Sequence, residues 1–254
     1  YTNGICSNDV RSFFPGGHSG DDGSPANVAW STIDQITNAS QGNSIDWGDL
    51  TQEIHGSAVT SSPTRGIRFA GATSPGNTNQ NVIDYFSLQS AGNAVDFGDM
   101  TSVRRYHAGT GSEVRGISWA HHSPSVTDVI EYITIASTGD SADFGNLTAS
   151  NRVGASFSNG VRAWKAGGAT PSADNTVEYI AIASTGNSTD AGDLTVARKW
   201  AVGLSQAHGG LHDGRHWSTN PPINYWQSSA SGRAVLGGGY DSSYATDRMD
   251  YITV

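Results

Sequence analysis

The sequence predicts an all-β protein folded as a five-bladed β-propeller, and three observations carry this prediction. The first is an arginine-led apolar element that stands once between successive copies of a second, longer segment. The second is the absence of any window with a sustained 3.6-residue apolar period, so no long helix is expected. The third is the longer segment itself, which occurs at 33–51, 83–101, 130–148 and 177–195, with a shorter copy from Met249. A repeat of about 47–50 residues built from short strands is typical of a propeller blade.

Each copy of the longer segment divides into two short strands. In the third copy, Ile130, Tyr132 and Thr134 alternate with their neighbours, and β-branched or aromatic residues at that spacing favour a strand. Residues 138–141 have the chemistry of a turn, because Gly and Asp accept a positive φ. Residues 143–147 are then the expected second strand with its turn.

The arginine-led element ends in most units at a pair of glycines. Its arginines are Arg11, Arg65, Arg115, Arg162 and Arg233. One arginine at the same place in each unit indicates a structural role, in which the guanidinium hydrogen-bonds backbone or carboxylate groups of its own or an adjacent blade. We expect the loss of one such buried pairing to cost about 3–5 kcal/mol. In the third unit His121 and His122 stand where units one, four and five have two glycines, and we expect them at a loop mouth. Loops are expected at 18–27 and 71–81.

The two elements together give five units within a single domain, 1–254. The approximate boundaries of the units are 1–51, 52–101, 102–148, 149–195 and 196–254. The most clearly predicted strands lie near 10–14, 33–38, 65–70, 83–88, 115–119, 130–136, 161–166, 177–183, 233–237 and 249–254. The last unit carries an insertion before its arginine and is expected to lack its outermost strand. A solenoid has a similar period, but it needs polar capping units, whereas a closed ring needs none.

Composition excludes several classes of protein. The formal net charge is −9, and nucleic-acid binding needs clustered Lys and Arg, so no nucleic-acid partner is expected. No apolar run approaches the length of a membrane span, so no membrane insertion is expected. Cys6 is the only cysteine, which leaves no disulfide within the chain. No cofactor and no metal are expected.

Four parts of the repeat recur in one order: an apolar strand ending in two glycines, a variable loop, a strand with an acid and a tyrosine, and an aromatic strand followed by an arginine. Examples are Gly167-Gly168, Val177-Glu178-Tyr179, Asp143-Phe144 and Arg198. This order resembles the kelch repeat. The wording of the longer segment is most similar to kelch-like segments in structural and tail-fibre proteins of tailed bacteriophages, especially marine phages. The resemblance covers nearly the whole chain and implies a propeller on a virion.

Two enzyme families share this kind of fold. The segments at Ser44, Ser141 and Ser188 match the first half of the sialidase-type Asp-box, but a threonine stands one place beyond its aromatic position. A sialidase-type site would need an arginine cluster and a tyrosine nucleophile, whereas these residues occur here at repeated positions. Copper oxidases of the kelch superfamily need a Cys–Tyr crosslink, for which Cys6 is the one candidate thiol.

The acidic residues recur in two series, which we interpret as structural. The first is Asp34, Asp84, Glu131, Glu178 and Asp250, and the second is Asp46, Asp96, Asp143 and Asp190. A catalytic pair needs two carboxyl groups in different environments, and groups that recur in each unit do not provide them. We therefore expect turn and ion-pair roles.

The insertion in the last unit is the predicted functional site, because it breaks the repeat symmetry and loops on a rigid scaffold carry binding. The candidate ligand-binding residues are His208, His212, Asp213, Arg215, His216, Trp217, Tyr225 and Trp226. Aromatic rings stack on sugars and also dominate protein hot spots. The three histidines at a spacing of four would suit a metal on a helix, but Gly209, Gly210 and Gly214 disfavour one. The alternative is that Trp217 and Trp226 plug the channel or cover the last blade.

These observations and the resemblance lead us to expect a non-enzymatic propeller located outside the cell or on a virion surface. Its expected partner is a cell-surface glycan or a protein receptor, with neighbouring virion subunits as further partners. The alternative is a structural module that joins subunits of a fibre or appendage. The third hypothesis is a glycoside-acting, sialidase-like enzyme.

Overall fold

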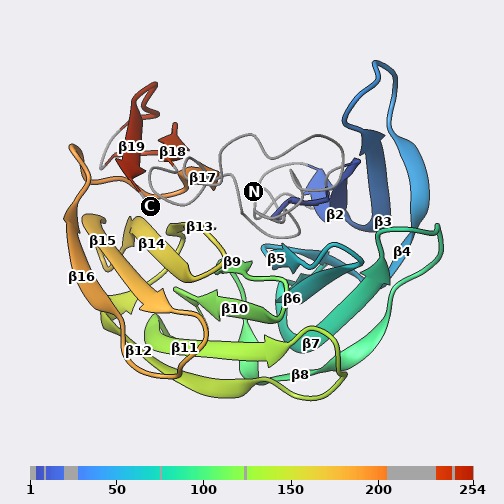
Figure 1. The fold of residues 1–254 in the computed structure, drawn as a ribbon, viewed down its shortest axis with the longest axis horizontal. Helices are drawn as coiled ribbons and strands as arrows, with labels where there is room; N and C mark the ends of the chain where they lie inside the picture. Colours follow the sequence, from blue (N-terminus) through green and yellow to red (C-terminus); the bar gives the residue numbers. More distant parts are fainter. Residues whose placement is uncertain are drawn as a thin grey trace, which may run out of the picture.

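The computed structural model describes residues 4–8, 10–19, 28–74, 76–122, 125–204, 233–241 and 244–253. The regular elements of these residues are all β-strands, as Figure 1 shows. The expected all-β class is therefore confirmed, and each strand span given above overlaps a strand of the structure.

The strands follow one another in antiparallel units that correspond to the sequence repeats. Unit one holds β1 (Cys6–Ser7), β2 (Arg11–Ser19), β3 (Val28–Thr37) and β4 (Ile45–His55). Unit two holds β5 (Ala58–Ser61), β6 (Arg65–Thr73), β7 (Thr78–Ser87) and β8 (Val95–Arg104). Unit three holds β9 (Ala108–Gly111), β10 (Arg115–Trp119), β11 (Thr127–Thr134) and β12 (Ala142–Asn151). Unit four holds β13 (Ala155–Ser158), β14 (Arg162–Ala169), β15 (Ala173–Ala181) and β16 (Thr189–Asp193). Unit five holds β17 (Val202–Leu204), β18 (Arg233–Gly237) and β19 (Met249–Thr253).

Successive units are joined at one recurring backbone junction. Between units one and two, β4 pairs with β6 through Ile54–Thr73 and His55–Ala72, which makes one eight-stranded sheet of the two units. The later junctions are isolated bridges at the equivalent positions: Arg105–His122, Arg152–Ala169 and Lys199–Tyr240. The units therefore join in the same way throughout, and the first sheet is larger only because its junction has two residue pairs instead of one.

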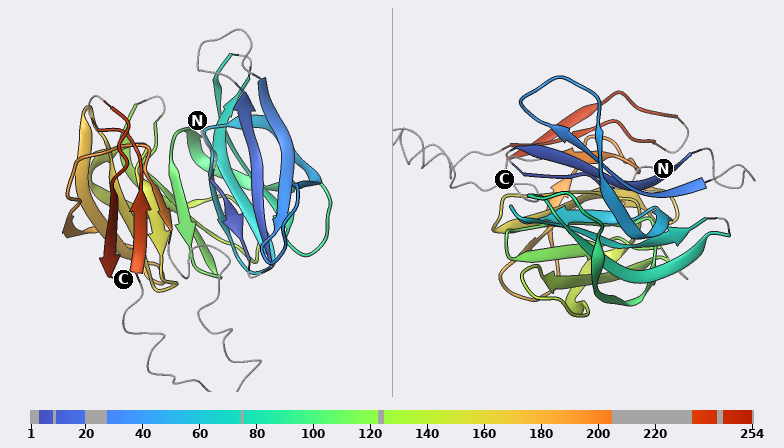
Figure 2. Two further views of the ribbon diagram at one scale, coloured as in Figure 1. Left: turned by 90° about the horizontal axis from the view of Figure 1, so that it is seen from above. Right: turned by 90° about the vertical axis from the view of Figure 1, so that its right-hand side faces the viewer.

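The units curl into an arc around a common centre. The short strands β5, β9 and β13 lie toward this centre, and β4, β8, β12 and β16 lie at the periphery (Figure 1). The inner strands are neighbours, because β5 contacts β1 and β9, and β13 contacts β9 and β17. Unit one, in blue, and unit five, in red, stand apart at the two ends of the arc in Figure 1 and in the left view of Figure 2.

The core is divided into apolar clusters, most of which lie between adjacent units. In three of these clusters one side includes the tyrosine of the acid-and-tyrosine strand, and the other includes an isoleucine of the following unit. The pairs found within the clusters are Tyr85 with Ile133, Tyr132 with Ile180, and Tyr179 with Ile252. Burying such side chains stabilises each interface by about 1.5–3 kcal/mol per aliphatic residue, so each unit depends on its neighbour.

The repeated arginines lie at these same interfaces. Arg65 donates from Nη1 to the Ile135 carbonyl of unit three at 2.9 Å, and its guanidinium lies 4.8 Å from the centre of the Tyr85 ring. Arg11 and Arg115 donate in the same way to the Leu88 and Ile182 carbonyls of the next units. For these three arginines the expected backbone contacts are confirmed.

These arginines are more exposed than expected, so losing one of them should cost less stability than the sequence analysis predicts. Arg65 is half-buried, and Arg162 is exposed over the Tyr179 ring, 4.7 Å from its centre. Water screens such groups, so removing Arg162 should cost about 1 kcal/mol or less rather than the cost of a buried pair. The residue that would accept from Arg162 by repeat equivalence is Val254, which lies outside the described residues, and so does the side chain of Arg233.

Four acids of the first series pair with cations, and three of these, Asp84, Glu131 and Glu178, are buried; Asp34 is half-buried and has no ion pair among the described residues. The threonine of the preceding unit hydrogen-bonds the carboxylate, as Thr51 does with Asp84 at 2.5 Å. The cation comes from a different place in each unit. The pairs are Arg68 with Asp84, Arg104 with Glu131, Lys165 with Glu178, and Arg198 with Asp250. In the second series, Asp46 and Asp190 each accept from the backbone N–H two residues later. These contacts support the interpretation that the repeated acids are structural.

The loops after the glycine pairs are shorter than expected. β2 continues to Ser19 and β6 to Thr73, so the strands do not stop at the glycines. The register shifts there instead, between Pro15 and Gly17 in unit one. Gly17 has a φ of 121°, and glycine accepts this conformation without a Cβ clash, so the strand bends at a bulge and goes on.

The placement of the histidine pair also differs from the expectation. The strand register puts Ala120 and His121, not His121 and His122, at the positions of the glycine pair. His121 is fully buried beneath the strand rather than at a loop mouth, and its Nε2 lies 3.3 Å from Ser118 Oγ. His122 is half-buried and bridges to Arg105 and Val126.

Candidate functional site

The predicted binding residues of the insertion lie outside the described residues, so the structure neither groups nor separates them. They are His208, His212, Asp213, Arg215, His216, Trp217, Tyr225 and Trp226. The described residues contain a different candidate, which sequence analysis did not identify.

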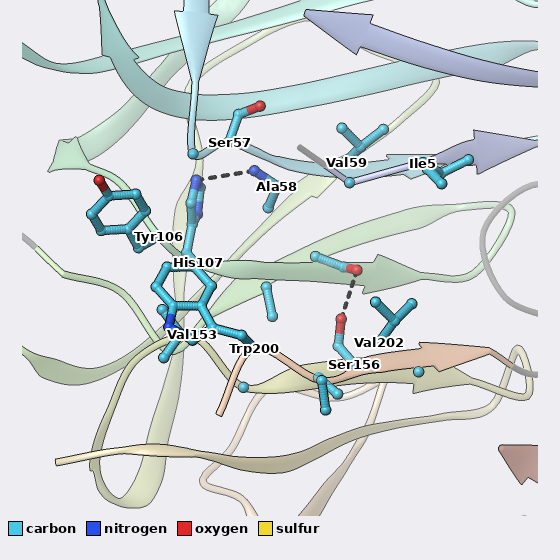
Figure 3. Close-up of a pocket in the computed structure, with 18 residues that line it drawn as sticks. Ile5, Ser57, Ala58, Val59, Tyr106, His107, Val153, Ser156, Trp200 and Val202 are labelled. Atoms are coloured by element: carbon cyan, nitrogen blue, oxygen red, sulfur yellow. Dashed lines mark hydrogen bonds between the residues drawn. The ribbon is translucent and has the colours of Figure 1, made fainter. Parts of the chain in front are cut away.

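A cavity of about 220 Å³ lies at the centre of the arc, between the inner strands (Figure 3). Every unit contributes the same short stretch to its wall, which is the segment that enters the inner strand. The lining residues are Gly4, Ile5, 56–59, 106–109, 153–156 and 200–203. The wall is mostly apolar, and half of its lining residues are glycine or alanine. A cavity lined equivalently by five units is the common interior of the arc.

Four left-handed residues, called the backbone ring below, line the end of this cavity that we call its mouth. Gly56, Tyr106, Val153 and Trp200 occupy equivalent positions, with φ values of 63°, 54°, 54° and 60°. The last three each donate a backbone hydrogen bond to the residue of the preceding unit. The N–H of Tyr106 donates to the carbonyl of Gly56 at 2.7 Å, and that of Val153 donates to Tyr106 at 3.2 Å. The N–H of Trp200 donates to Val153 at 3.0 Å.

The left-handed conformation of three residues of this backbone ring costs conformational free energy. A non-glycine residue in the left-handed region costs about 1–2 kcal/mol, and a β-branched one such as Val153 is an outlier there. Strain of this kind persists where the surrounding structure determines it and concentrates at functional sites. Here the inter-unit hydrogen bonds hold three residues in this conformation, which fixes the shape of the mouth.

Two aromatic side chains stand on the ring. The Tyr106 and Trp200 rings meet edge to face, with centres 5.4 Å apart. Tyr106 is almost buried, whereas 36% of Trp200 is exposed. Trp200 therefore presents an aromatic surface at the mouth, supported by Tyr106 beneath it.

A cationic or ionisable side chain immediately precedes each member of the ring. These residues are His55, Arg105, Arg152 and Lys199. The Arg105 guanidinium lies 4.8 Å from the centre of the Tyr106 ring. Burial, followed by the charges of Arg152 and Arg105, lowers the pKa of His122, so these three groups share one region. Arg105 and His122 both lie beside Tyr106, because the centres of the His122 and Tyr106 rings are 6.3 Å apart, so positive charge gathers next to the mouth in a chain that is acidic as a whole.

One wall of the cavity contains a buried imidazole, that of His107. Its Nε2 lies 3.2 Å from the backbone nitrogen of Ala58 and 3.1 Å from the carbonyl oxygen of Phe69, and its Nδ1 lies 2.8 Å from Ser118 Oγ. Burial, with the Arg104 charge adding to it, lowers the pKa of His107 to about 3. This histidine is therefore neutral and serves as a fixed hydrogen-bonding link between units two and three.

The described residues also bear on metal binding, thiol reactivity and membrane spanning. No group of three or more His, Cys, Asp or Glu side chains in this part of the chain is placed to hold a metal ion. Cys6 is buried, and burial raises the pKa of its thiol, so the thiolate form is disfavoured. No helix long and apolar enough to cross a membrane occurs among the described residues.

No protein-family model matches the chain, and no curated protein matches it.

The ring and its cations were missed because sequence alone gave too weak a signal. Position 56 and its equivalents hold Gly, Tyr, Val and Trp, which share neither size nor polarity. The one available signal was the recurrence of a basic or imidazole side chain just before that position, which becomes visible once the copies are aligned at their arginines.

Proposed function

We propose that the chain is a closed five-bladed propeller of the kelch-like type, and that it is a non-enzymatic binding module. Its ligand is a surface glycan or a glycan-bearing receptor. By the resemblance to phage segments, its place is a virion surface or another extracellular appendage. The observation that carries the proposal is the central cavity, which five equivalent segments line and whose mouth bears an exposed tryptophan.

Closure of the ring is supported by two exposed apolar faces. The tyrosine of each interface described above packs in a cluster with an isoleucine of the next unit. In unit five the equivalent tyrosine is Tyr251, which is 65% exposed, and in unit one the equivalent isoleucine is Ile36, which is 36% exposed. These two faces are the two halves of one more interface of the same kind. Their mutual burial completes the ring and removes the apolar surface that an open arc leaves in water.

A binding role is supported by the rigidity and chemistry of the mouth. The carboxylates of Asp84, Glu178 and Asp250 are held in structural ion pairs, which leaves them unsuited to acid–base catalysis. The mouth offers an aromatic face, backbone groups held in a hydrogen-bonded ring, and an apolar hollow below. This combination suits a sugar ring, which stacks its apolar face on an indole and hydrogen-bonds through its hydroxyls.

The experiment is a glycan array and a whole-cell binding assay with the wild type and two variants. Trp200→Gly removes the indole and keeps a residue that accepts positive φ, as Gly56 does in unit two. Val161→Ala is the matched control, because Val161 is an exposed apolar residue of unit four just before the first residue of β14, at the opposite end of this strand from the mouth. We expect Trp200→Gly to lose binding and Val161→Ala to keep it, both with melting temperatures close to that of the wild type.

Full binding by Trp200→Gly would move the site away from the mouth. Loss of binding in a Trp217→Ala variant would then assign it to the insertion, as the sequence predicts.

The alternative, a module that joins subunits of a fibre, is favoured by one observation. The exposed residues Met249, Tyr251 and Val235 lie on one face of the β18–β19 pair. If this face contacts another subunit instead of unit one, the purified chain should associate with rising concentration and bind no glycan. Sedimentation velocity over a range of concentrations measures this.

A further inference from the structure

We propose that the mouth of the cavity is an oxyanion site, which selects ligands bearing a carboxylate or sulfate group. This deepens the proposed function and rests on it as far as the ligand is a glycan. The oxyanion site is formed by Arg105, Arg152, His122 and Lys199. Its charges come from the cationic positions of the ring and from the strand that bridges to them.

The first argument is the concentration of charge. The Arg105 guanidinium lies 4.8 Å from the centre of the Tyr106 ring, and that centre lies 6.3 Å from the centre of the His122 ring. Burial, followed by the charges of Arg152 and Arg105, lowers the pKa of His122, which agrees with this grouping. Lys199 occupies the equivalent position one unit further on. The whole chain has a formal net charge of −9, so a mouth with three permanent cations contrasts with its surroundings. Like charges repel, and such a group is stable where an anion or water compensates it.

The second argument is that these half-buried cations lack the carboxylate partners that the fully buried cations have. Arg68, Arg198 and Lys165 each form an ion pair with a carboxylate. In the part of the chain that the structure describes, no carboxylate forms an ion pair with Arg105, Arg152 or Lys199. The Nε of Arg105 and the Nδ1 of His122 are buried atoms without a hydrogen-bond partner among the described residues. The Arg105 Nε–H is a donor without an acceptor, which is costly, and an oxyanion would supply that acceptor.

The third argument is geometric preorganisation. The guanidinium of Arg105 rests on the ring of Tyr106, the next residue, which belongs to the backbone ring that links the units. The backbone of Arg105 is further fixed by its hydrogen bonds with His122, at 3.1 Å and 2.9 Å. An arginine held in this way loses little conformational freedom on binding and offers a fork of donors that fits carboxylate and sulfate oxygens.

The site favours an acidic glycan over a polynucleotide. A nucleic acid needs a track of basic residues that follows its phosphates, and the chain is strongly acidic outside the mouth. The mouth offers one compact cationic region beside one exposed indole. A saccharide unit with one acidic substituent matches this pair of features, with the ring on Trp200 and the oxyanion on Arg105 and Arg152.

The test measures binding of defined probes by isothermal titration calorimetry at low ionic strength. The probes are sodium sulfate, a sulfated polysaccharide, a polyuronate and neutral dextran, so the arms separate sulfate from carboxylate and charge from sugar. The variants are Arg152→Gln and Arg105→Gln. The matched control is Arg162→Gln, which removes the same charge from an exposed residue at the opposite end of β14.

We expect the wild type to bind the sulfated polysaccharide or the polyuronate, and to bind dextran more weakly. We expect Arg152→Gln and Arg105→Gln each to raise the dissociation constant about tenfold or more, as for the loss of a charge-assisted hydrogen bond. Arg162→Gln should stay within about twofold of the wild type, since an exposed distant charge is screened. Melting temperatures close to the wild type in all three variants exclude loss of the fold as the cause.

Two results would overturn the inference. One is equal affinity of the wild type and Arg152→Gln for the acidic probes. The other is an equal loss in the Arg162→Gln control, which would show charge attraction without a site. If neutral glycans bind in a Trp200-dependent way and sulfate does not compete, the oxyanion inference fails and the proposed function stands. If sulfate binds through Arg152 and no glycan binds at all, the proposed function fails and the oxyanion site stands.

Discussion

Replacing His107 tests whether the wall of the cavity depends on a neutral imidazole. His107 is buried, and burial together with the Arg104 charge lowers its pKa to about 3, from a value of 6.5 in the absence of these effects. The unfolded chain takes up a proton on this histidine near pH 6.5, whereas the folded chain does not until about pH 3. The folded state therefore loses stability as the pH falls below 6.5, and this loss ends only near pH 3.

The size of the effect follows from this difference. Between pH 7 and pH 5 the unfolded histidine becomes almost fully protonated and the folded one stays neutral. This lowers the free energy of unfolding by about 2 kcal/mol. This free-energy difference is nearly the same for any folded-state pKa close to 3, because pH 5 lies well above that value. His121, whose pKa burial also lowers, acts in the same direction, so the wild type should lose more than His107 alone contributes.

The assay is urea unfolding at pH 7 and pH 5 for the wild type and for His107→Ser. Serine is the residue at the equivalent position of unit two, Ser57, so the variant copies a neighbour. We expect the variant to be less stable at pH 7, because the link from Ala58 to Ser118 is lost. Its free energy of unfolding should then fall by about 2 kcal/mol less than that of the wild type between the two pH values.

An equal fall in both proteins would refute the reasoning. If His107→Ser does not fold, NMR titration of the wild-type histidines gives the same answer. The His107 imidazole should remain neutral at pH 5, and protonation of this ring above pH 5 in the folded protein would be the contrary result.

Two further predictions concern the joints between units. Gly145→Ala should cost about 1–3 kcal/mol more than Gly192→Ala, measured by thermal or urea unfolding. A Cβ at Gly145 would lie 2.4 Å from the carbonyl oxygen of Gly186 in the next unit, whereas one at Gly192 meets nothing within 4 Å; equal losses would mean that the close approach does not matter. Lys165→Leu should cost about 3–5 kcal/mol, because it leaves the carboxylate of Glu178 buried without its cation. A loss below about 1 kcal/mol would show that Glu178 is not held as a buried charge.

Much of the fold was predictable from the sequence because the same strand and turn patterns recur in each unit. An alternating stretch such as Ile130 to Thr134 and a glycine pair such as Gly167-Gly168 recur at fixed spacing, and repetition separates them from chance. The extent of the strands was not predictable. Glycine usually ends a strand, but here Gly17 makes a bulge, and the ladder continues beyond it because the partner strand also continues.

The cavity and its mouth were not predictable for physical reasons. The inner strands are short and rich in small residues, so they show no alternation of apolar and polar side chains. Tyr106, Val153 and Trp200 adopt a backbone conformation that their own preferences oppose, and only hydrogen bonds between units hold them there. The burial of His121 beside Glu131 likewise depends on packing between strands far apart in the chain.

The central claim is a closed ring of five units around the cavity, and a crosslink between its ends tests it most directly. The test protein carries Ile36→Cys and Tyr251→Cys, and a control carries Tyr179→Cys and Ile252→Cys, the equivalent pair at the interface between units four and five. The native Cys6 is buried and does not compete. A short bis-maleimide is applied at low protein concentration, and intact mass distinguishes a bridge within one chain from one between chains. The account predicts an internal bridge in both proteins. An internal bridge in the control, with the test pair left open or joined only between chains, would contradict it.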